Sequence, residues 1–138
     1  MVESIRKMDY FVVNVPNKRG EGTKLLQALS NEGVNLVAFT GFPGTSGKAQ
    51  LDFVPDNSAA FRSAAERMKL KLKAPKTVFI INGDDRKGAI AGVTSKLAEA
   101  KISITAVDAV SAGNGSFAAM LWVKAKDVDK AATILGAR

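Results

Sequence analysis

The chain of 138 residues contains no cysteine and no histidine. Without cysteine it can form no disulfide, thiolate nucleophile or zinc–sulfur centre. Without histidine it lacks the usual general base near neutral pH and the commonest transition-metal ligand. An enzyme built from this chain would depend on carboxylates, lysines, hydroxyls or backbone dipoles, and no carboxylate pair has a spacing that indicates catalysis. We therefore predict a non-catalytic protein with no cofactor and no metal site.

Long apolar runs are also missing, because no segment has 18 or more consecutive apolar residues. This excludes a membrane span, and residues 1–10 show no signal-peptide core, so we expect a cytoplasmic protein with no membrane partner. Hydrophobic residues make up 46% and charged residues 24%, as in globular domains. The net charge of +7 attracts anions without choosing among nucleic acid, acidic lipid and carboxylate ligands.

The main positive feature is an internal repeat. When the chain is shifted by 68 positions, one frame aligns residues 11–53 with residues 79–121 without a gap, and conservative apolar pairs fill the positions between identities. This pattern indicates a duplicated unit of about half the chain, with units at residues 1–74 and 75–138. The identical pairs are Phe11/Phe79, Asn14/Asn82, Gly20/Gly88, Leu29/Leu97, Ala38/Ala106 and Gly47/Gly115.

Each unit shows the same order of predicted elements. An apolar run of strand length is followed by a polar turn that ends in glycine, and then by apolar residues at helical spacing. A second strand, a glycine-rich hairpin link, a third strand and a second helix complete the pattern. In the first unit, the alternation of Lys69-Leu70-Lys71-Leu72-Lys73 predicts a fourth strand.

This order predicts an α+β fold of two ferredoxin-like βαββαβ units in tandem, each an antiparallel sheet with its helices on one face. We expect the second unit to lack its last strand, because Arg138 follows directly after the predicted helix near Leu135. The sequence leaves three alternatives for that sheet edge: it is open, the N-terminal segment covers it, or another chain does.

Several of these residues resemble the ACT domain, a small regulatory module. The resemblance covers residues 10–135 and depends on two turns and on the segments that lead into the second strands. The segments are Asn17-Lys18-Arg19-Gly20 with Gly33-Val34-Asn35-Leu36, and Asp85-Arg86-Lys87-Gly88 with Lys101-Ile102-Ser103-Ile104. The chain departs from the family pattern in having Arg19 and Lys87 before the turn glycines and Ser103 in place of asparagine.

The resemblance implies a stand-alone tandem module that binds an amino acid as a sensor or regulatory subunit, with a partner enzyme. It also implies side-by-side pairing, and hence a homodimer. A glycine at a helix start lets a carboxylate approach free N–H groups at the positive end of the helix dipole. The candidate ligand-binding residues are Val15, Pro16, Asn17, Lys18, Arg19, Gly20, Glu21 and Asn35 in the first unit, and Asp84, Asp85, Arg86, Lys87, Gly88 and Ser103 in the second.

Other interpretations stay open at this point. Glycine at a strand-to-helix turn is often only a backbone requirement, and Asp84-Asp85 at a helix start need not converge on a magnesium ion. The alternative function is a ligand-free module for dimerisation or for contact with a partner enzyme. The strand at 117–123, which is apolar on both faces, favours such contacts. Nucleic-acid binding through the lysines of 69–76 ranks third, because the aromatic motif of an RNA-binding sheet is missing.

Overall fold

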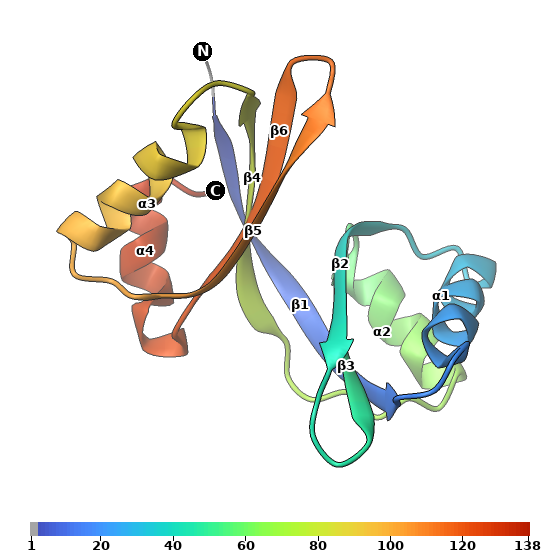
Figure 1. The fold of residues 1–138 in the computed structure, drawn as a ribbon. Coiled ribbons are helices and arrows are strands. Elements are labelled where there is room, and N and C mark those ends of the chain that lie inside the picture. Colours follow the sequence, from blue (N-terminus) through green and yellow to red (C-terminus); the bar gives the residue numbers. More distant parts are fainter. Residues whose placement is uncertain (1–2) are drawn as a thin grey trace. The chain divides into compact units, whose positions relative to one another are not determined.

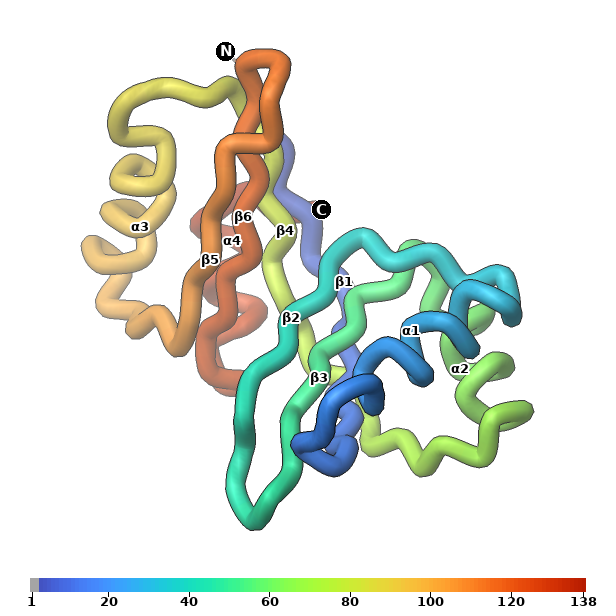
Figure 2. The backbone as a smooth tube through the Cα atoms, turned by 45° about the vertical axis from the view of Figure 1, so that its right-hand side comes forward, coloured from blue at the N-terminus to red at the C-terminus, as the bar shows by residue number. Residues whose placement is uncertain are grey.

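The computed structural model describes residues 3–138, which form six strands and four α-helices (Figures 1 and 2). These residues group into two compact units. The first unit is Asp9–Lys76, and the second unit is Thr77–Arg138 together with the N-terminal residues up to Met8.

The first unit is a three-stranded antiparallel sheet with two helices on one face (Figure 1). The strands lie in the order β2-β3-β1, and the register places Phe53 beside Phe11 and Phe39. Phe11, Phe53 and Phe61 form an almost fully buried aromatic core. The elements are the second half of β1 (Ser4–Pro16), α1 (Glu21–Asn31), β2 (Leu36–Pro43), β3 (Lys48–Pro55) and α2 (Ser58–Arg67).

The second unit repeats this plan, with the strand order β1-β4-β6-β5 and both helices on one face (Figure 1). Figure 2 shows the β5–β6 hairpin as the counterpart of the β2–β3 hairpin. Its core includes Phe79, Leu97 and Leu121, all fully buried. The elements are β4 (Lys76–Asp84), α3 (Ala89–Glu99), β5 (Ile104–Gly113), β6 (Ser116–Val123), a short 3₁₀ helix (Ala125–Asp127) and α4 (Val128–Leu135).

The repeat extends to individual backbone hydrogen bonds. The Val34 N–H donates to the Leu29 carbonyl at 3.0 Å, and the Ile102 N–H donates to the Leu97 carbonyl at 2.9 Å. The Phe11–Phe53 register of β1 and β3 recurs as Phe79–Leu121 in β4 and β6. The predicted α+β class and the two ferredoxin-like units with one-sided helices are therefore confirmed.

Strand β1 contributes to both units. Its residues 4–8 lie on the outer side of β4, and Ile5 joins the core of the second unit. Arg138 adds two bonds there: its carbonyl accepts from the Lys7 N–H at 2.9 Å, and its N–H donates to the Ile5 carbonyl at 3.1 Å. The N-terminal segment thus occupies the place of the last strand of the second unit. The two compact units also differ from the predicted units at residues 1–74 and 75–138, because the residues up to Met8 group with the second unit.

The predicted strand at Lys69-Leu70-Lys71-Leu72-Lys73 is wrong. Helix α2 ends at Arg67, and Lys69 follows its C-cap residue with a left-handed backbone (φ 58°). Residues 70–75, all within the described part of the chain, form no strand. Leu70 and Leu72 nevertheless pack against the first unit's core. The alternation of lysine and leucine therefore indicates only that successive side chains face solvent and core in turn. An extended segment can do this without forming the hydrogen bonds of a sheet.

Candidate ligand site

Two equivalent turns connect a strand to a helix. Gly20 precedes α1 with φ 88°, and Gly88 precedes α3 with φ 77°, so both helices start from a left-handed residue. The Asn17 N–H donates to the Gly47 carbonyl, and the Asp85 N–H donates to the Gly115 carbonyl, each at 2.9 Å. A Cβ at either helix-start glycine would meet no protein atom within 4 Å. The positive φ therefore explains these glycines, as no protein backbone comes close to them.

Both helix starts lack a side-chain cap within the described chain. The N–H groups of a helix's first turn have no intrahelical acceptor, and they stand at the positive end of its dipole. The Glu21 N–H donates to the Lys18 carbonyl at 3.3 Å, and the Ala89 N–H donates to the Arg86 carbonyl at 3.2 Å. Acceptors for the next N–H groups of each helix can come from water or from an anionic ligand. The two turns differ in what surrounds these donors.

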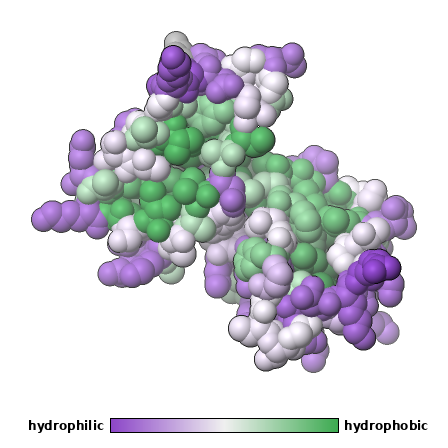
Figure 3. Space-filling model, in the orientation of Figure 1, coloured by the Kyte–Doolittle hydropathy of each residue, from purple (hydrophilic) through white to green (hydrophobic). Residues whose placement is uncertain are grey.

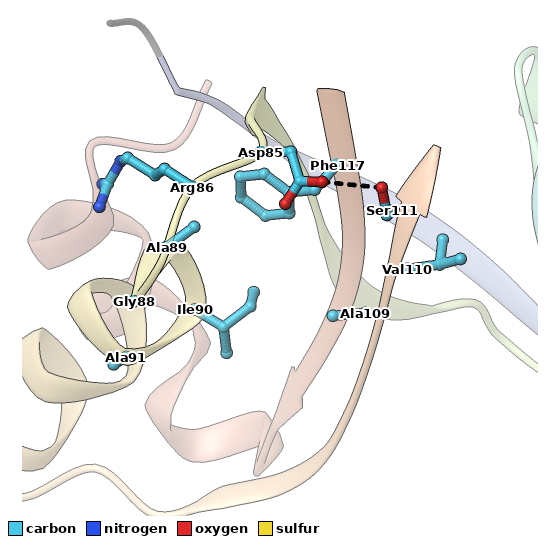
Figure 4. A pocket seen from close by; sticks show the side chains of 10 residues that line it. All are labelled: Asp85, Arg86, Gly88, Ala89, Ile90, Ala91, Ala109, Val110, Ser111 and Phe117. Atoms are coloured by element: carbon cyan, nitrogen blue, oxygen red, sulfur yellow. Dashed lines mark hydrogen bonds between the residues drawn. The ribbon is translucent and has the colours of Figure 1, made fainter. Parts of the chain in front are cut away.

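A cavity of about 320 Å³ lies at the second turn, between the start of α3 and the end of β5. In Figure 4, Ile90 points into the space that separates α3 from β5. All of its lining residues belong to the second unit. They are Asp85, Arg86, Gly88, Ala89, Ile90, Ala91, Ala109, Val110, Ser111 and Phe117.

The polar end of the cavity is the pair Asp85 and Ser111. The Ser111 hydroxyl donates to Asp85 Oδ2 at 2.8 Å and holds the carboxylate beside the helix start (Figure 4). The Arg86 side chain points away from this pair in the same view. The rest of the wall is mostly apolar, with Ile90, Val110 and Phe117 as its largest apolar side chains. The cavity thus offers a carboxylate, helix N–H donors and apolar surface within one space.

The first turn has different chemistry at the matching positions. Asn17 stands where the second unit has Asp85, and Pro43 stands where it has Ser111. The first helical residue of α1 is Glu21, which pairs with Lys24 at 3.7 Å. This carboxylate already complements the positive end of the α1 dipole, so an anionic ligand would meet a like charge there.

Asn35 and Ser103 do not lie with the turns of their own units. Asn35 precedes β2, whose first residue, Leu36, is paired with Pro55 at one end of β3, whereas Lys48 at the other end is paired with Pro16 beside the turn. The Asn35 Nδ2 donates to Asp56 Oδ2 at 3.4 Å. Ser103 precedes β5 in the same way. Because β2 and β5 run back along the full sheet, one ligand cannot touch the turn and these residues within a single unit.

The remaining predicted residues lie at or beside the turns. Val15 and Pro16 pair with β3, and Asp84 pairs with Ser116 of β6. Lys18, Arg19 and Lys87 are exposed and surround the turns with positive charge. Several residues that line the cavity were not predicted from the sequence, among them Ala109, Val110 and Ser111 of β5, together with Ile90 and Phe117. The β-α-β order could have predicted the β5 residues. The first and second strands of a unit run parallel, so the end of the second strand lies on the same side of the sheet as the turn after the first strand.

Two further observations concern metal binding and membrane spans. No group of three or more histidine, cysteine, aspartate or glutamate residues is placed to hold a metal ion among residues 3–138. Within the same range, no helix has the length and apolar character needed to cross a membrane.

Comparison with known proteins gave fold relatives only. No protein-family model and no curated protein matches the sequence. Among solved structures, protein BT0572 of Bacteroides thetaiotaomicron superposes with a TM-score of 0.79 and 19% identity, covering 97% of this chain and 88% of that protein.

Two regulatory subunits of aspartate kinase are also similar in structure. The Thermus flavus subunit has a TM-score of 0.62 and 14% identity over 98% of this chain and 94% of its own. The ligand-free Thermus thermophilus subunit has a TM-score of 0.60 and 11% identity over 97% and 94%. At these identities the likeness establishes a shared fold.

Proposed function

We propose that the chain is a non-catalytic regulatory module that binds an amino acid in the cavity at the second turn. The observation that carries this proposal is the Asp85 carboxylate, held by Ser111 beside the uncapped start of α3. The ammonium group of an amino acid would pair with Asp85, and its carboxylate would accept from the helix N–H groups. Its side chain would contact Ile90 and Val110.

The fold relatives support a regulatory role. The Thermus proteins are regulatory subunits of aspartate kinase, and they share nearly the full length of this fold. By analogy with them, this module would act on a partner enzyme rather than on a substrate of its own. The two turns would not be equivalent, because Glu21 and Pro43 alter the first one.

A second candidate function is an interaction module without a small ligand. Large apolar side chains are exposed on the edge strands of both units: Phe39 and Phe42 on β2, and Val107 and Val110 on β5. Figure 3 shows apolar residues reaching the surface in both units. Such surfaces suit contact with another protein chain.

Thermal-shift screening against the common amino acids, followed by calorimetry, tests the ligand-binding function. A bound amino acid should raise the melting temperature by mass action. Asp85→Asn keeps the shape but removes the charge, so it should weaken binding by roughly tenfold or more. Asn17→Ala, at the matching position of the first turn, is the control and should leave affinity unchanged.

Two results would contradict the proposal. If no amino acid shifts the melting temperature at millimolar concentration, the interaction module is the better function. If an amino acid binds with the same affinity to wild type and to the Asp85 variant, the ligand occupies another site.

A further inference from the structure

A second cavity, of about 350 Å³, lies in the first unit. Its lining is Phe11, Arg62, Leu72, Lys73, Ala74 and Pro75, so it belongs to β1, α2 and the segment that follows α2. None of these residues lies in the turn at 17–20. The cavity is therefore independent of the proposed amino-acid site, which lies in the other unit.

A difference between the two units explains this cavity. In the second unit, residues 4–8 lie as a strand on the outer side of β4. The matching segment of the first unit is residues 70–75, which follow α2, form no strand and line the cavity together with Phe11 of β1. A segment that packs through Leu72 but forms no ladder leaves space beside Phe11.

The inner wall of the cavity is apolar. Phe11 is 2% exposed, and its ring stacks on Phe61 with 4.7 Å between the centroids. Leu72, Ala74 and Pro75 supply the facing wall. Because the Phe11 ring is almost fully buried, most of the apolar surface open to a ligand comes from Leu72, Ala74 and Pro75, and a flat apolar group can pack along it.

The rim of the cavity is cationic. The Arg62 guanidinium carbon lies 5.5 Å from the centroid of the Phe11 ring, and Lys73 lines the same opening. Residues 62–76 contain six lysines and arginines against one acidic residue, Glu66. Of those six, Arg67 is paired with Glu32 on α1. The charges at the opening therefore favour an anion and disfavour a ligand with an ammonium group.

We infer that this cavity is a binding site for a small aromatic carboxylate. Its volume exceeds the roughly 150 Å³ of an apolar cavity that takes up benzene, so a substituted single ring fits within it. The ring would lie against Leu72, Ala74 and Pro75, and the carboxylate would accept hydrogen bonds from Arg62 and Lys73 at the opening. Because Arg62 and Lys73 are separate donors at this opening, each can be substituted alone to test its contribution to carboxylate binding.

Phenylacetate and its neutral amide, phenylacetamide, are the probes for this site. Calorimetry with the full chain should show that phenylacetate binds more tightly than phenylacetamide. Arg62→Met and Lys73→Met keep the apolar stems and remove the charges, so each should weaken phenylacetate binding by several-fold, and both together by roughly tenfold or more. Neither substitution should alter phenylacetamide binding to the same extent.

Lys71→Met is the matched control, since Lys71 stands two residues from Lys73 on the same segment but does not line the cavity. It changes the net charge equally and should leave affinity unchanged. Ala74→Trp should block the cavity and abolish binding of both probes. Amide NMR shifts on addition of phenylacetate should concentrate at residues 72–74.

Three outcomes would overturn the inference. They are the absence of saturable phenylacetate binding, equal affinity for the acid and the amide, and an equal loss in the Lys71 and Lys73 variants. The last result would mean that only the general positive charge of the segment attracts the probe. Each outcome is independent of the amino-acid site, because the Asp85→Asn chain should bind phenylacetate normally.

Discussion

Asp52 is a buried carboxylate within the sheet of the first unit. It is 5% exposed and lies on β3, where the Gln50 Nε2 donates to its Oδ1 at 2.9 Å. Burial raises the pKa of Asp52 above its ordinary value of 3.8, while the Gln50 hydrogen bond and the charge of Lys76 act in the opposite direction. Burial, together with the charge of Asp52, also raises the pKa of Tyr10. The folded chain therefore holds a proton on Asp52 more tightly than the unfolded chain does.

This difference predicts how stability depends on pH. Between pH 3.8 and the raised pKa, the folded state binds more protons than the unfolded state, so the contribution of Asp52 to stability falls as pH rises. Asp52→Asn keeps an acceptor for Gln50 and removes the ionisation. We expect urea unfolding to show the variant gaining on wild type from pH 3.5 to pH 7. The unfolding free energy of the variant minus that of wild type should therefore become more positive as pH rises, and a difference that stays constant or becomes more negative would contradict the prediction.

At the scale of the element, the ends of α1 and α3 form a natural comparison. Each helix is followed by a residue in the left-handed region, Gly33 at φ 79° and Lys101 at φ 61°. The same closing bonds form at both ends, from Val34 to Leu29 and from Ile102 to Leu97. The second unit thus keeps the cap geometry with a residue that has a Cβ.

Lys101→Gly should therefore stabilise the chain by roughly 0.5–1 kcal/mol, because the left-handed strain of a non-glycine residue is of order 1–2 kcal/mol and glycine's unfolded-state entropy offsets part of it. Gly33→Ala should destabilise the chain by a similar or larger amount. Chemical denaturation measures both changes. If Lys101→Gly lowers stability, contacts of the lysine side chain outweigh the backbone strain.

Elements that depend on local chemistry were the most predictable. Both hairpin links contain successive positive φ angles, at Ser46 and Gly47 in the first unit and at Gly113, Asn114 and Gly115 in the second, and their glycine-rich sequences accommodate this backbone. The fourth strand at 69–73 failed because a strand needs a backbone partner, which local alternation does not reveal. In the second unit the strand beside β4 is formed by residues 4–8, which are distant in the sequence, so local alternation does not reveal it either.

At the scale of the whole molecule, the repeat was predictable but the composition of the site was only partly so. Of the predicted ligand-binding residues, Asp85, Arg86 and Gly88 line the cavity, whereas Asn35 and Ser103 lie at the far ends of their sheets. The family resemblance groups residues by motif, whereas strand direction decides which ones share a sheet end. Ser111, the partner of Asp85, carries no motif of its own.

We expect the chain to form a homodimer through an exposed strand edge, and sedimentation equilibrium should then give twice the 14.5 kDa chain mass. Lysine on an edge strand opposes strand pairing. Val107→Lys on β5 and Phe42→Lys on β2 therefore test one edge each, and the variant that dissociates identifies the interface. A single 14.5 kDa species for wild type at high concentration would exclude the dimer.

The division of β1 between the two units has a consequence for biosynthesis. Residues 4–8 emerge from the ribosome before Asp9–Lys76, but most of β4 and Arg138, which hold them in the second unit, emerge after it. At about 5–20 residues per second, several seconds pass before β4 is available. The first unit can fold during that interval while residues 4–8 stay without their sheet partner, so vectorial synthesis itself imposes the order in which the two halves mature.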